Sequence, residues 1–394
     1  MRIVVSGGGT AGHISPTLAT SDALKSLDST VEILYIGQAG SLEERLVAAR
    51  GLEFAAIKAG KFRRDQQAGK LSKLVNLQTI GPNSADVFRT VAGLAASVKI
   101  LRRFKPDVIF LKGGYVCVPV GLAARMLRIP FVIHESDISP GLTSKLLSKW
   151  ATKIAVAFPT RHYRDFEASR LVFTGSPVRA EISSAHRLEG LARFELSSDL
   201  PVVFVTGGSG GARQINEVII QALPQLLETC QVIHLTGEGE YEHVKFELSR
   251  MPELEHKDRY RVFGFLLEGM PYAFAAADVV ISRAGANAIA ELATLRKPTV
   301  LIPNYQMASH QMENARVLSR AGAARVLDGS KLTPDKLVGE VRHLLGDPEE
   351  QGRLSKAIEQ FSNPDAAMAL AKLILDTAGV GKRVERKPNT GDAA

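Results

Sequence analysis

At 394 residues the chain is too long for one ordinary hydrophobic core, which predicts two domains. A hydrophobic content of 45% with 23% charged residues is typical of a globular protein, and no apolar run reaches membrane-spanning length. The chain starts without a basic-then-apolar leader, so we expect a protein that stays in the cytoplasm. The net charge of +8 favours polyanionic partners or serves solubility alone. Cys117 and Cys230 fit neither a disulfide framework nor a metal site.

The first half of the chain alternates short apolar strands with helical segments, of which Ala85–Phe104 has the clearest apolar stripe. This alternation predicts a parallel sheet covered by helices on both faces, with ligands at the C-terminal ends of the strands. The predicted strands are Arg2–Ser6, Val31–Ile36, Glu53–Ala56, Val108–Leu111, Phe131–His134 and Lys153–Val156.

A glycine-rich stretch, Ser6–Pro16, lies between the first strand and the first helix, and we call it the first glycine loop. Glycines let the backbone approach a ligand closely, and the N–H groups of a helix start attract anions. The loop has neither the dinucleotide-binding spacing nor the Walker spacing. His13 at its end suggests proton transfer beside a charged substrate, or else it only caps the helix.

Residues 58–84 interleave basic and apolar side chains, and we call this segment the basic–apolar segment. Such a pattern fits either an interfacial membrane patch or a solvated basic loop with its apolar residues tucked under. The basic residues are Lys58, Lys61, Arg63, Arg64, Lys70 and Lys73, and the apolar ones are Phe62, Leu71, Leu74, Val75, Leu77 and Ile80.

The second half repeats the plan of the first, and turn residues place the domain boundary near 174–180. Its first strand is followed by the second glycine loop, Thr206–Arg213, and then by a helix with Ile215, Val218, Ile219 and Leu223 on one face. Two equivalent loops favour a nucleotide-linked substrate, although a duplicated scaffold without matching function is the alternative. The tail from Gly379 is polar and should be disordered. The predicted strands are Val202–Val205, Gln231–Leu235, Tyr260–Val262, Val279–Ile281 and Thr299–Ile302.

Two later clusters add polar groups to this half. Small residues and a glycine start a helix at Arg283–Glu291, which again makes an anion site, and Glu291 could accept hydrogen bonds from both hydroxyls of a ribose. Gln311 and Asn314 share a helix face and carry the amides that hexose hydroxyls need. His310 is a further polar contact or is simply exposed.

Taken together, these segments resemble the MurG family of bacterial UDP-N-acetylglucosamine transferases, in order from residue 1 to about 375. Pro364-Asp365-Ala366 also resembles the family's last helix, which crosses back to the first domain. The other motifs that carry the resemblance are the two glycine loops, Gly113-Gly114-Tyr115-Val116, His134-Glu135, Pro140-Gly141-Leu142, Gly175-Ser176-Pro177-Val178-Arg179 and Gln311-x-x-Asn314-Ala315.

The resemblance implies an α/β fold of the GT-B type, with two Rossmann-like doubly wound parallel-sheet domains facing a cleft. The implied divisions are an acceptor- and membrane-facing domain (1–175), a UDP-sugar-binding domain (176–360), a returning helix (361–378) and the tail (379–394). The residues implied to bind UDP-N-acetylglucosamine are Thr10, Ala11, Gly12, Asp137, Arg179, Ser209, Leu266, Ala286, Asn287, Ala288, Ile289, Ala290, Glu291, Gln311 and Asn314.

By position, the resemblance places Ser209 and Arg179 on the diphosphate and the backbone of Leu266 on the uracil edge. Glu291 would bind the ribose and Gln311 the sugar hydroxyls. The transferred sugar would contact Thr10, Ala11 and Gly12, with His13 beside the acceptor.

The implied reaction is an inverting displacement without a catalytic metal or a cofactor, in which the muramyl 4-hydroxyl of lipid I attacks the donor sugar to give lipid II for peptidoglycan synthesis. The helix start near Ala286 and the Ser209 loop would stabilise the leaving UDP. His13 is the first candidate for the base, with Glu135 and Asp137 as rivals. The expected partners are UDP-N-acetylglucosamine, lipid I and the anionic cytoplasmic face of the cell membrane, where the protein would be peripheral, but no nucleic acid.

The chain departs from the family pattern at Ala11-Gly12, often Gly-Gly, at His134–Asp137, often His-Glu-Gln-Asn, and at His310-Gln311, often Gln-Gln. Asp137 lacks an amide donor, which makes its contact the least secure. Alternative functions are a UDP-N-acetylglucosamine 2-epimerase or a glycolipid synthase of the same fold, or a non-catalytic sugar-nucleotide-binding subunit. The basic–apolar segment argues against the epimerase, and His13 with a complete first domain argues against the subunit.

Overall fold

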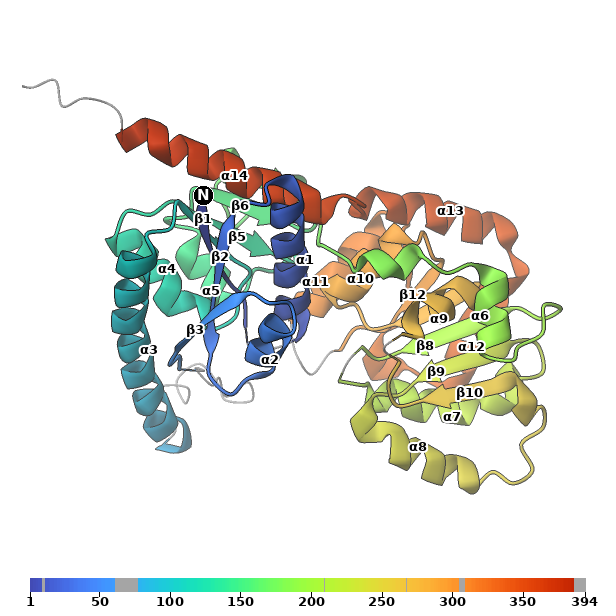
Figure 1. Ribbon diagram of the computed structural model, residues 1–394. Helices are drawn as coiled ribbons and strands as arrows, with labels where there is room; N and C mark the ends of the chain where they lie inside the picture. Colours follow the sequence, from blue (N-terminus) through green and yellow to red (C-terminus); the bar gives the residue numbers. More distant parts are fainter. Residues whose placement is uncertain (9–10, 61–76, 209, 267, 305–308, 386–394) are drawn as a thin grey trace, which may run out of the picture. The chain divides into compact units, whose positions relative to one another are not determined.

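The computed structural model describes residues 1–8, 11–60, 77–208, 210–266, 268–304 and 309–385. These residues form two compact units (Figure 1). The first unit contains Met1–Glu135, Pro140–Pro177 and the chain from Asp365, and the second contains Ser136–Ser139 and Val178–Pro364. Each unit has one parallel sheet with helices packed on it, as the alternation of strands and helices predicts.

The sheet of the first unit has seven parallel strands in the order β3-β2-β1-β4-β5-β6-β7. Most of its strands are apolar runs buried on both faces, which is typical of a sheet covered on both sides. Strands are added to one side of β1 as far as β3 and to its other side from β4 onward, so the strand order switches between β1 and β4. In this class of fold, ligands bind at the C-terminal ends of the strands at such a switch point. The strands are β1 (Arg2–Ser6), β2 (Glu32–Gln38), β3 (Glu53–Ile57), β4 (Val108–Leu111), β5 (Phe131–Glu135), β6 (Lys153–Val156) and β7 (Leu171–Phe173).

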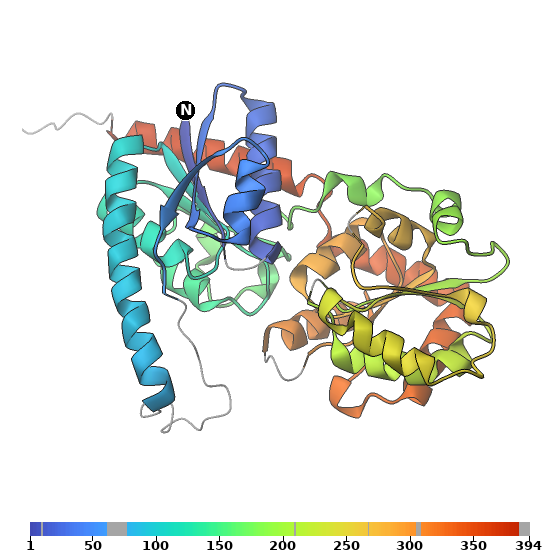
Figure 2. The ribbon, with the colours of Figure 1, turned by 60° about the horizontal axis from the view of Figure 1, so that its bottom comes forward.

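Helices of the first unit pack on both sides of this sheet. On one side, α1 and α14 share a core with β1, to which Leu18, Leu370 and Ile374 contribute buried side chains. Figure 2 shows the long α3 on the other side of the sheet. The helices are α1 (Ala11–Leu27), α2 (Leu42–Ala48), α3 (Leu77–Phe104), α4 (Cys117–Met126), α5 (Leu142–Leu147) and α14 (Ala366–Glu385).

The last helix is longer than the sequence pattern indicates. We expected a disordered tail from Gly379, but α14 continues to Glu385. Its turns before Gly379 are anchored on α1 through buried Leu370, Ile374 and Ala378, and adding residues to an established helix costs less than starting one. The rest of the predicted tail, 386–394, lies outside the described residues.

The second unit repeats the doubly wound plan with six parallel strands in the order β10-β9-β8-β11-β12-β13. The switch in its strand order lies between β8 and β11. The final strand was not predicted, because two residues are too short to show a pattern. The strands are β8 (Val202–Thr206), β9 (Gln231–Leu235), β10 (Tyr260–Phe263), β11 (Val279–Ser282), β12 (Thr299–Leu301) and β13 (Arg325–Val326).

The described part of the second unit contains eight α-helices, several of which pack on this sheet. The four apolar residues predicted on one face of α7 are all buried in the core of the unit, beside Val203 and Val205 of β8. The helices are α6 (Arg187–Arg193), α7 (Arg213–Leu226), α8 (Glu238–Ser249), α9 (Met270–Ala276), α10 (Ala286–Thr294), α11 (Ser309–Arg320), α12 (Pro334–Gly346) and α13 (Pro348–Ile358).

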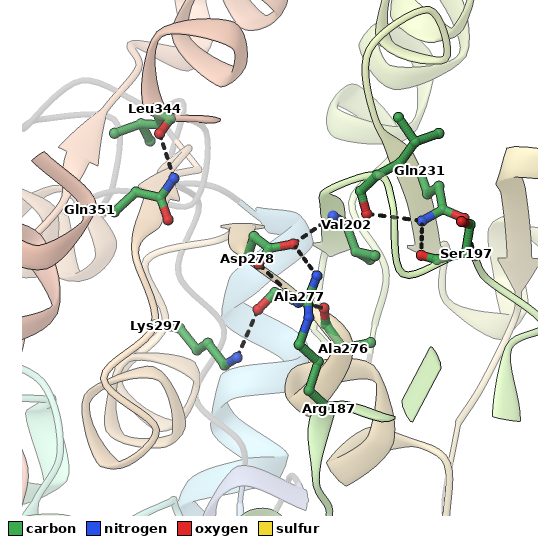
Figure 3. Close-up of polar contacts among 11 residues, drawn as sticks. Arg187, Ser197, Val202, Gln231, Ala276, Ala277, Asp278, Lys297, Leu344 and Gln351 are labelled. Atoms are coloured by element: carbon green, nitrogen blue, oxygen red, sulfur yellow. Dashed lines mark hydrogen bonds and ion pairs between the residues drawn. The ribbon is translucent and has the colours of Figure 1, made fainter. Parts of the chain in front are cut away.

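A charged cluster joins the ends of β8, α6 and α9 (Figure 3). Asp278 accepts two hydrogen bonds from the Arg187 guanidinium, at 2.8 and 3.0 Å, and one from the Val202 backbone N–H at 2.8 Å. Lys297 donates to the carbonyl of Ala277 at 2.7 Å, and burial lowers the pKa of Lys297 to about 8. A carboxylate with three donors of this kind is a stabilising feature rather than a surface ion pair.

We expect Asp278→Ala to lower the free energy of unfolding by about 2 kcal/mol, because Arg187 and the Val202 N–H both lose their acceptor. Urea unfolding of the variant measures this loss. Glu242→Ala is the control, since Glu242 is 82% exposed and lies 3.9 Å from Lys245. If both substitutions lower the free energy of unfolding equally, the Asp278 cluster does not stabilise the fold as described.

Candidate functional site

The first glycine loop packs closely against its own unit. The carbonyl of Gly7 accepts a hydrogen bond from the buried Tyr35 hydroxyl. A Cβ at Gly7 would lie 2.6 Å from Thr17 Oγ1, and a Cβ at Gly8 would overlap the buried carboxylate of Glu43. No side chain therefore fits at the start of the loop. Thr10, which we expected at the sugar, lies outside the described residues.

A second backbone segment supports this loop from β4. Gly113 and Gly114 adopt φ values of 111° and 86°, which favour glycine. A Cβ at Gly114 would overlap the Gly8 carbonyl, so the two segments meet backbone to backbone. The Lys112 side chain, only 2% exposed, begins this segment.

His13 lies in the first turn of α1, which starts inside the first glycine loop with Ala11 and Gly12. Its Nδ1 is buried and has no hydrogen-bond partner among the described residues. A Cβ at Gly113 would lie 3.5 Å from the ring, so His13 and Gly113 are neighbours. Burial, and secondarily the Lys112 ammonium, lowers the pKa of His13 to about 4. His13 is therefore a neutral imidazole at pH 7.

Both rival bases are engaged in hydrogen bonds within the protein, Glu135 with a backbone group and Asp137 with a side chain. Glu135 Oε2 accepts from the Gly141 N–H at 3.0 Å, and Asp137 Oδ1 accepts from Asn314 Nδ2 at 2.8 Å. His134 is buried, and its Nε2 lies 2.9 Å from the Gly175 carbonyl, to which it must donate. These contacts leave His13 as the better candidate for proton transfer.

The second glycine loop lies at the end of β8. Gly208 and Gly211 have φ values of 80° and 72°, and the Gly211 N–H donates to the Gly208 carbonyl at 3.0 Å. A Cβ at Gly207 would lie 2.5 Å from the Ala212 Cβ, so the loop turns tightly into α7. Ser209, which we expected at a diphosphate, lies outside the described residues.

The helix predicted to bind an anion is α10, and it starts after Gly285 at the end of β11. No side chain caps it, so its N-terminal dipole faces whatever anion approaches. The first residues of this helix are the predicted Ala286, Asn287 and Ala288. Ile289 and Ala290 are buried, so they support the helix by packing.

Glu291 lies in the second turn of α10 and is mostly shielded from water. Burial raises the pKa of Glu291 to about 7, and the Arg179 guanidinium partly opposes this shift. Its carboxylate makes no hydrogen bond to a described residue, so its oxygens are available to a ligand. Arg179 and Glu291 therefore lie close enough for their charges to interact.

The two amides of α11 differ in what they contact. Gln311 Oε1 accepts from the Asn304 N–H at 2.9 Å, while its amide nitrogen makes no hydrogen bond to a described residue. Asn314 is completely buried, and its Nδ2 donates to Asp137 Oδ1 and to the Ala284 carbonyl at 2.8 and 3.1 Å. Its Oδ1 accepts from the Ile138 N–H at 3.1 Å.

This bonding bears on the roles expected for Asn314, Asp137 and His310. All hydrogens of the Asn314 amide are used inside the second unit, which assigns Asn314 to holding loops rather than to a sugar. Asp137 takes part in the same set of hydrogen bonds, as the acceptor for Asn314. His310 Nδ1 lies 2.5 Å from the Ser139 carbonyl. The Ser136–Ser139 segment is therefore fastened to α11.

Leu266 follows β10 at the same edge of the second sheet as the glycine loop and α10. Its backbone makes no hydrogen bond to a described residue, which suits the uracil contact expected there. The neighbouring Phe265 ring is 53% exposed. Within each unit, the described site residues thus follow the C-terminal ends of the parallel strands, and Asn314 on α11 bonds Ala284 just beyond the end of β11.

Sequence reasoning missed Glu43 and Tyr35, which shape the first glycine loop, and gave no role to Lys112. Lys112 had a signal, because a charged residue directly follows the apolar β4. Glu43 and Tyr35 had none, since Glu43 lies in a short helix rich in charged residues and Tyr35 in an ordinary apolar strand. Most of the basic–apolar segment, 61–76, lies outside the described residues.

Both halves of the chain match domains of one known protein family. Residues 3–156 match the glycosyltransferase family 28 N-terminal domain, and residues 202–370 match the glycosyltransferase family 28 C-terminal domain. The UDP-N-acetylglucosamine--N-acetylmuramyl-(pentapeptide) pyrophosphoryl-undecaprenol N-acetylglucosamine transferase of Natranaerobius thermophilus is 34% identical over 377 residues, which is 95% of this chain and 99% of that protein. Its namesake in Desulfitobacterium hafniense (strain DSM 10664 / DCB-2) is 38% identical over 382 residues, or 96% of this chain and 100% of that protein.

Solved structures give the same fold. The crystal structure of MurG from Acinetobacter baumannii matches with a TM-score of 0.72 and 25% identity, over 95% of this chain and 99% of that one. The UDP-GlcNAc 2-epimerase of Neisseria meningitidis matches with a TM-score of 0.64 over 96% of this chain and 99% of that one, but with only 13% identity. The epimerase therefore shares the fold, without sequence similarity that would extend to its reaction.

Proposed function

This chain belongs to glycosyltransferase family 28, in its MurG group, and from that membership we propose that it transfers N-acetylglucosamine from UDP-N-acetylglucosamine to the muramyl 4-hydroxyl of lipid I. The product is lipid II for peptidoglycan synthesis. The observation that carries the proposal is identity of 34–38% over nearly the full length of relatives named for this transfer. Epimerases with the same fold are far less similar.

We assign the donor to the second unit. Glu291 accepts hydrogen bonds from the ribose hydroxyls, and the guanidinium of Arg179 faces the diphosphate beside the start of α10. The second glycine loop with Ser209 lies against the same diphosphate, and the Leu266 backbone contacts uracil. The spare amide nitrogen of Gln311 donates to the sugar hydroxyls.

We assign the acceptor and the base to the first unit, where Thr10, Ala11 and Gly12 accompany His13. The muramyl hydroxyl oxygen attacks the anomeric carbon, and His13 Nδ1 takes the hydroxyl proton. The bond from that carbon to the diphosphate oxygen breaks, and its electron pair leaves on UDP. With a pKa of about 4, His13 alone is a weak base, but bound diphosphates stabilise the imidazolium and raise that pKa.

Incubation with labelled UDP-N-acetylglucosamine and a short-chain lipid I analogue tests the reaction. We expect release of UDP together with a disaccharide-linked lipid, and His13→Ala should lower kcat by about 100-fold or more while UDP binding persists. A UDP-linked 2-epimer formed without the lipid would identify an epimerase and contradict the proposal. If the unaltered protein and the His13→Ala variant both bind UDP but neither forms product, the protein is a non-catalytic subunit and the proposal is wrong.

The raised pKa of Glu291 predicts a pH-dependent donor affinity. Accepting from two hydroxyls requires the carboxylate, whose population falls as the pH drops below about 7. Affinity for UDP-N-acetylglucosamine, measured by calorimetry, should therefore weaken about tenfold from pH 8 to pH 6. Glu291→Gln should bind weakly at both values. An unchanged affinity in the variant would remove Glu291 from the ribose.

We further propose that the first unit docks on the cytoplasmic face of an anionic membrane, where lipid I is embedded. Along α3, Val87, Phe88 and Val91 are 48%, 77% and 59% exposed, and they continue the basic–apolar segment. An apolar surface of this kind beside cations suits the lipid interface. In the part of the chain that the structure describes, no helix is both apolar and long enough to span a bilayer.

Phe88→Ser combined with Val91→Ser should reduce co-sedimentation with phosphatidylglycerol vesicles severalfold, because both exposed side chains lose their apolar surface. UDP binding should stay the same. The matched control is Phe246→Ser on α8 of the second unit, where Phe246 is 60% exposed. If the α3 variant and the control sediment alike, α3 is not the docking surface.

A further inference from the structure

Three polar side chains, the buried His234 and Asn216 and the partly buried Tyr260, form a chain of hydrogen bonds beneath the second glycine loop. His234 on β9 is completely buried, with Nδ1 2.8 Å from the Tyr260 hydroxyl and Nε2 3.0 Å from Asn216 Oδ1. Asn216 on α7 then donates from Nδ2 to the carbonyl of Thr236 at 3.1 Å. None of the three was singled out by the sequence, and none has a role in the transfer described above.

The direction of these hydrogen bonds follows from their last member. The Thr236 carbonyl only accepts, so Asn216 must turn its NH₂ toward it and its oxygen toward His234. His234 must then carry its hydrogen on Nε2, and Nδ1 must accept from the Tyr260 hydroxyl.

Burial keeps each group in the charge state that this direction requires. Burial lowers the pKa of His234 to about 3, so the ring is neutral and carries one N–H. Burial also raises the pKa of Tyr260, which retains its proton. The chain of bonds therefore runs one way, from Tyr260 to His234 to Asn216 to the Thr236 carbonyl.

The carbonyl at the end of this chain is part of the surface on which the glycine loop rests. A Cβ at Gly211 would overlap the Thr236 carbonyl, and a Cβ at Gly237 would lie 2.5 Å from the Gly211 Cα. Gly211 and Gly237 both have positive φ values, of 72° and 87°. A small shift of Thr236 therefore has to move Gly211, because no side chain lies between them to absorb it.

We propose that Tyr260, His234 and Asn216 are positioning residues that set the second glycine loop for the diphosphate of a nucleotide sugar and thereby determine donor affinity. The inference rests on the proposed function, which assigns the diphosphate to that loop. The three side chains touch no substrate themselves. They act through the Thr236 carbonyl and the Gly211 backbone.

Two substitutions test this relay by changing single atoms. Tyr260→Phe keeps the ring but removes the hydroxyl, which leaves His234 Nδ1 without its donor, and the dissociation constant for UDP should rise about fivefold. Asn216→Asp replaces the donor to Thr236 with a carboxylate that repels its carbonyl, so the constant should rise about tenfold or more. In both variants KM for the donor should rise, while kcat changes little.

Thr299→Val is the matched control. Its hydroxyl is also completely buried in the second sheet and donates to the Lys297 carbonyl at 2.8 Å, but it lies on β12, away from the glycine loop. Loss of this hydrogen bond should lower thermal stability as Tyr260→Phe does, without changing UDP affinity. A purely structural role for the relay would make all three variants bind UDP as the unaltered protein does, and this result would overturn the proposal.

Nitrogen-15 chemical shifts of the His234 ring in the unaltered protein give a second measurement that needs no variant. We expect a protonated Nε2 and a bare Nδ1 from pH 5 to pH 8, and the opposite tautomer would overturn the relay. If the unaltered protein itself binds no UDP, the proposed function fails, and the ring shifts still decide whether the hydrogen bonds run as described.

Discussion

Close contact between backbone segments is the constraint on which the site depends. In the first unit the Gly114 backbone meets the carbonyl of Gly8, and in the second the Gly211 backbone meets Thr236 and Gly237. These contacts exclude any side chain larger than hydrogen. They join the turns that follow neighbouring strands, the turn after β1 with that after β4 and the turn after β8 with that after β9. The same steric condition thus occurs twice in one chain, at the two edges where we propose that anionic groups of the substrates bind.

Burial around these edges sets the charge state of His13 and Glu291, to which we assign the proton transfer and the ribose. It lowers the pKa of His13 and raises that of Glu291, so both shifts favour the neutral form. A neutral imidazole is ready to accept a proton, and a carboxyl group near pKa 7 ionises readily when a ligand supplies hydrogen-bond donors. The buried Lys112 ammonium lowers the pKa of His13 further, and the half-buried Arg179 guanidinium opposes the rise in the pKa of Glu291.

The polar groups beneath the surface differ in their hydrogen bonding from those that we assign to the substrate. Asn314 and the Tyr260–His234–Asn216 relay have all their hydrogen bonds inside the second unit, so they fix loops. Glu291 and the amide nitrogen of Gln311 have none to described residues. Structures with the same fold but other reactions, such as the 2-epimerase, show why the fold alone does not identify the chemistry.

The sequence by itself determined most of the strands, the two glycine loops and the family, because apolar runs, glycine spacing and motif order are local properties. Its prediction of two parallel-sheet domains is confirmed, while the extent of α14 and the weak edge strand β13 were not foreseen. Only the tertiary structure decided that Asn314 is fully bonded, to Asp137, Ile138 and Ala284, which are distant in sequence. It likewise decided that His234 joins Tyr260 to Asn216. Hydrogen bonding of a buried amide or imidazole depends on which strands and helices become neighbours, and no pattern along the chain records that.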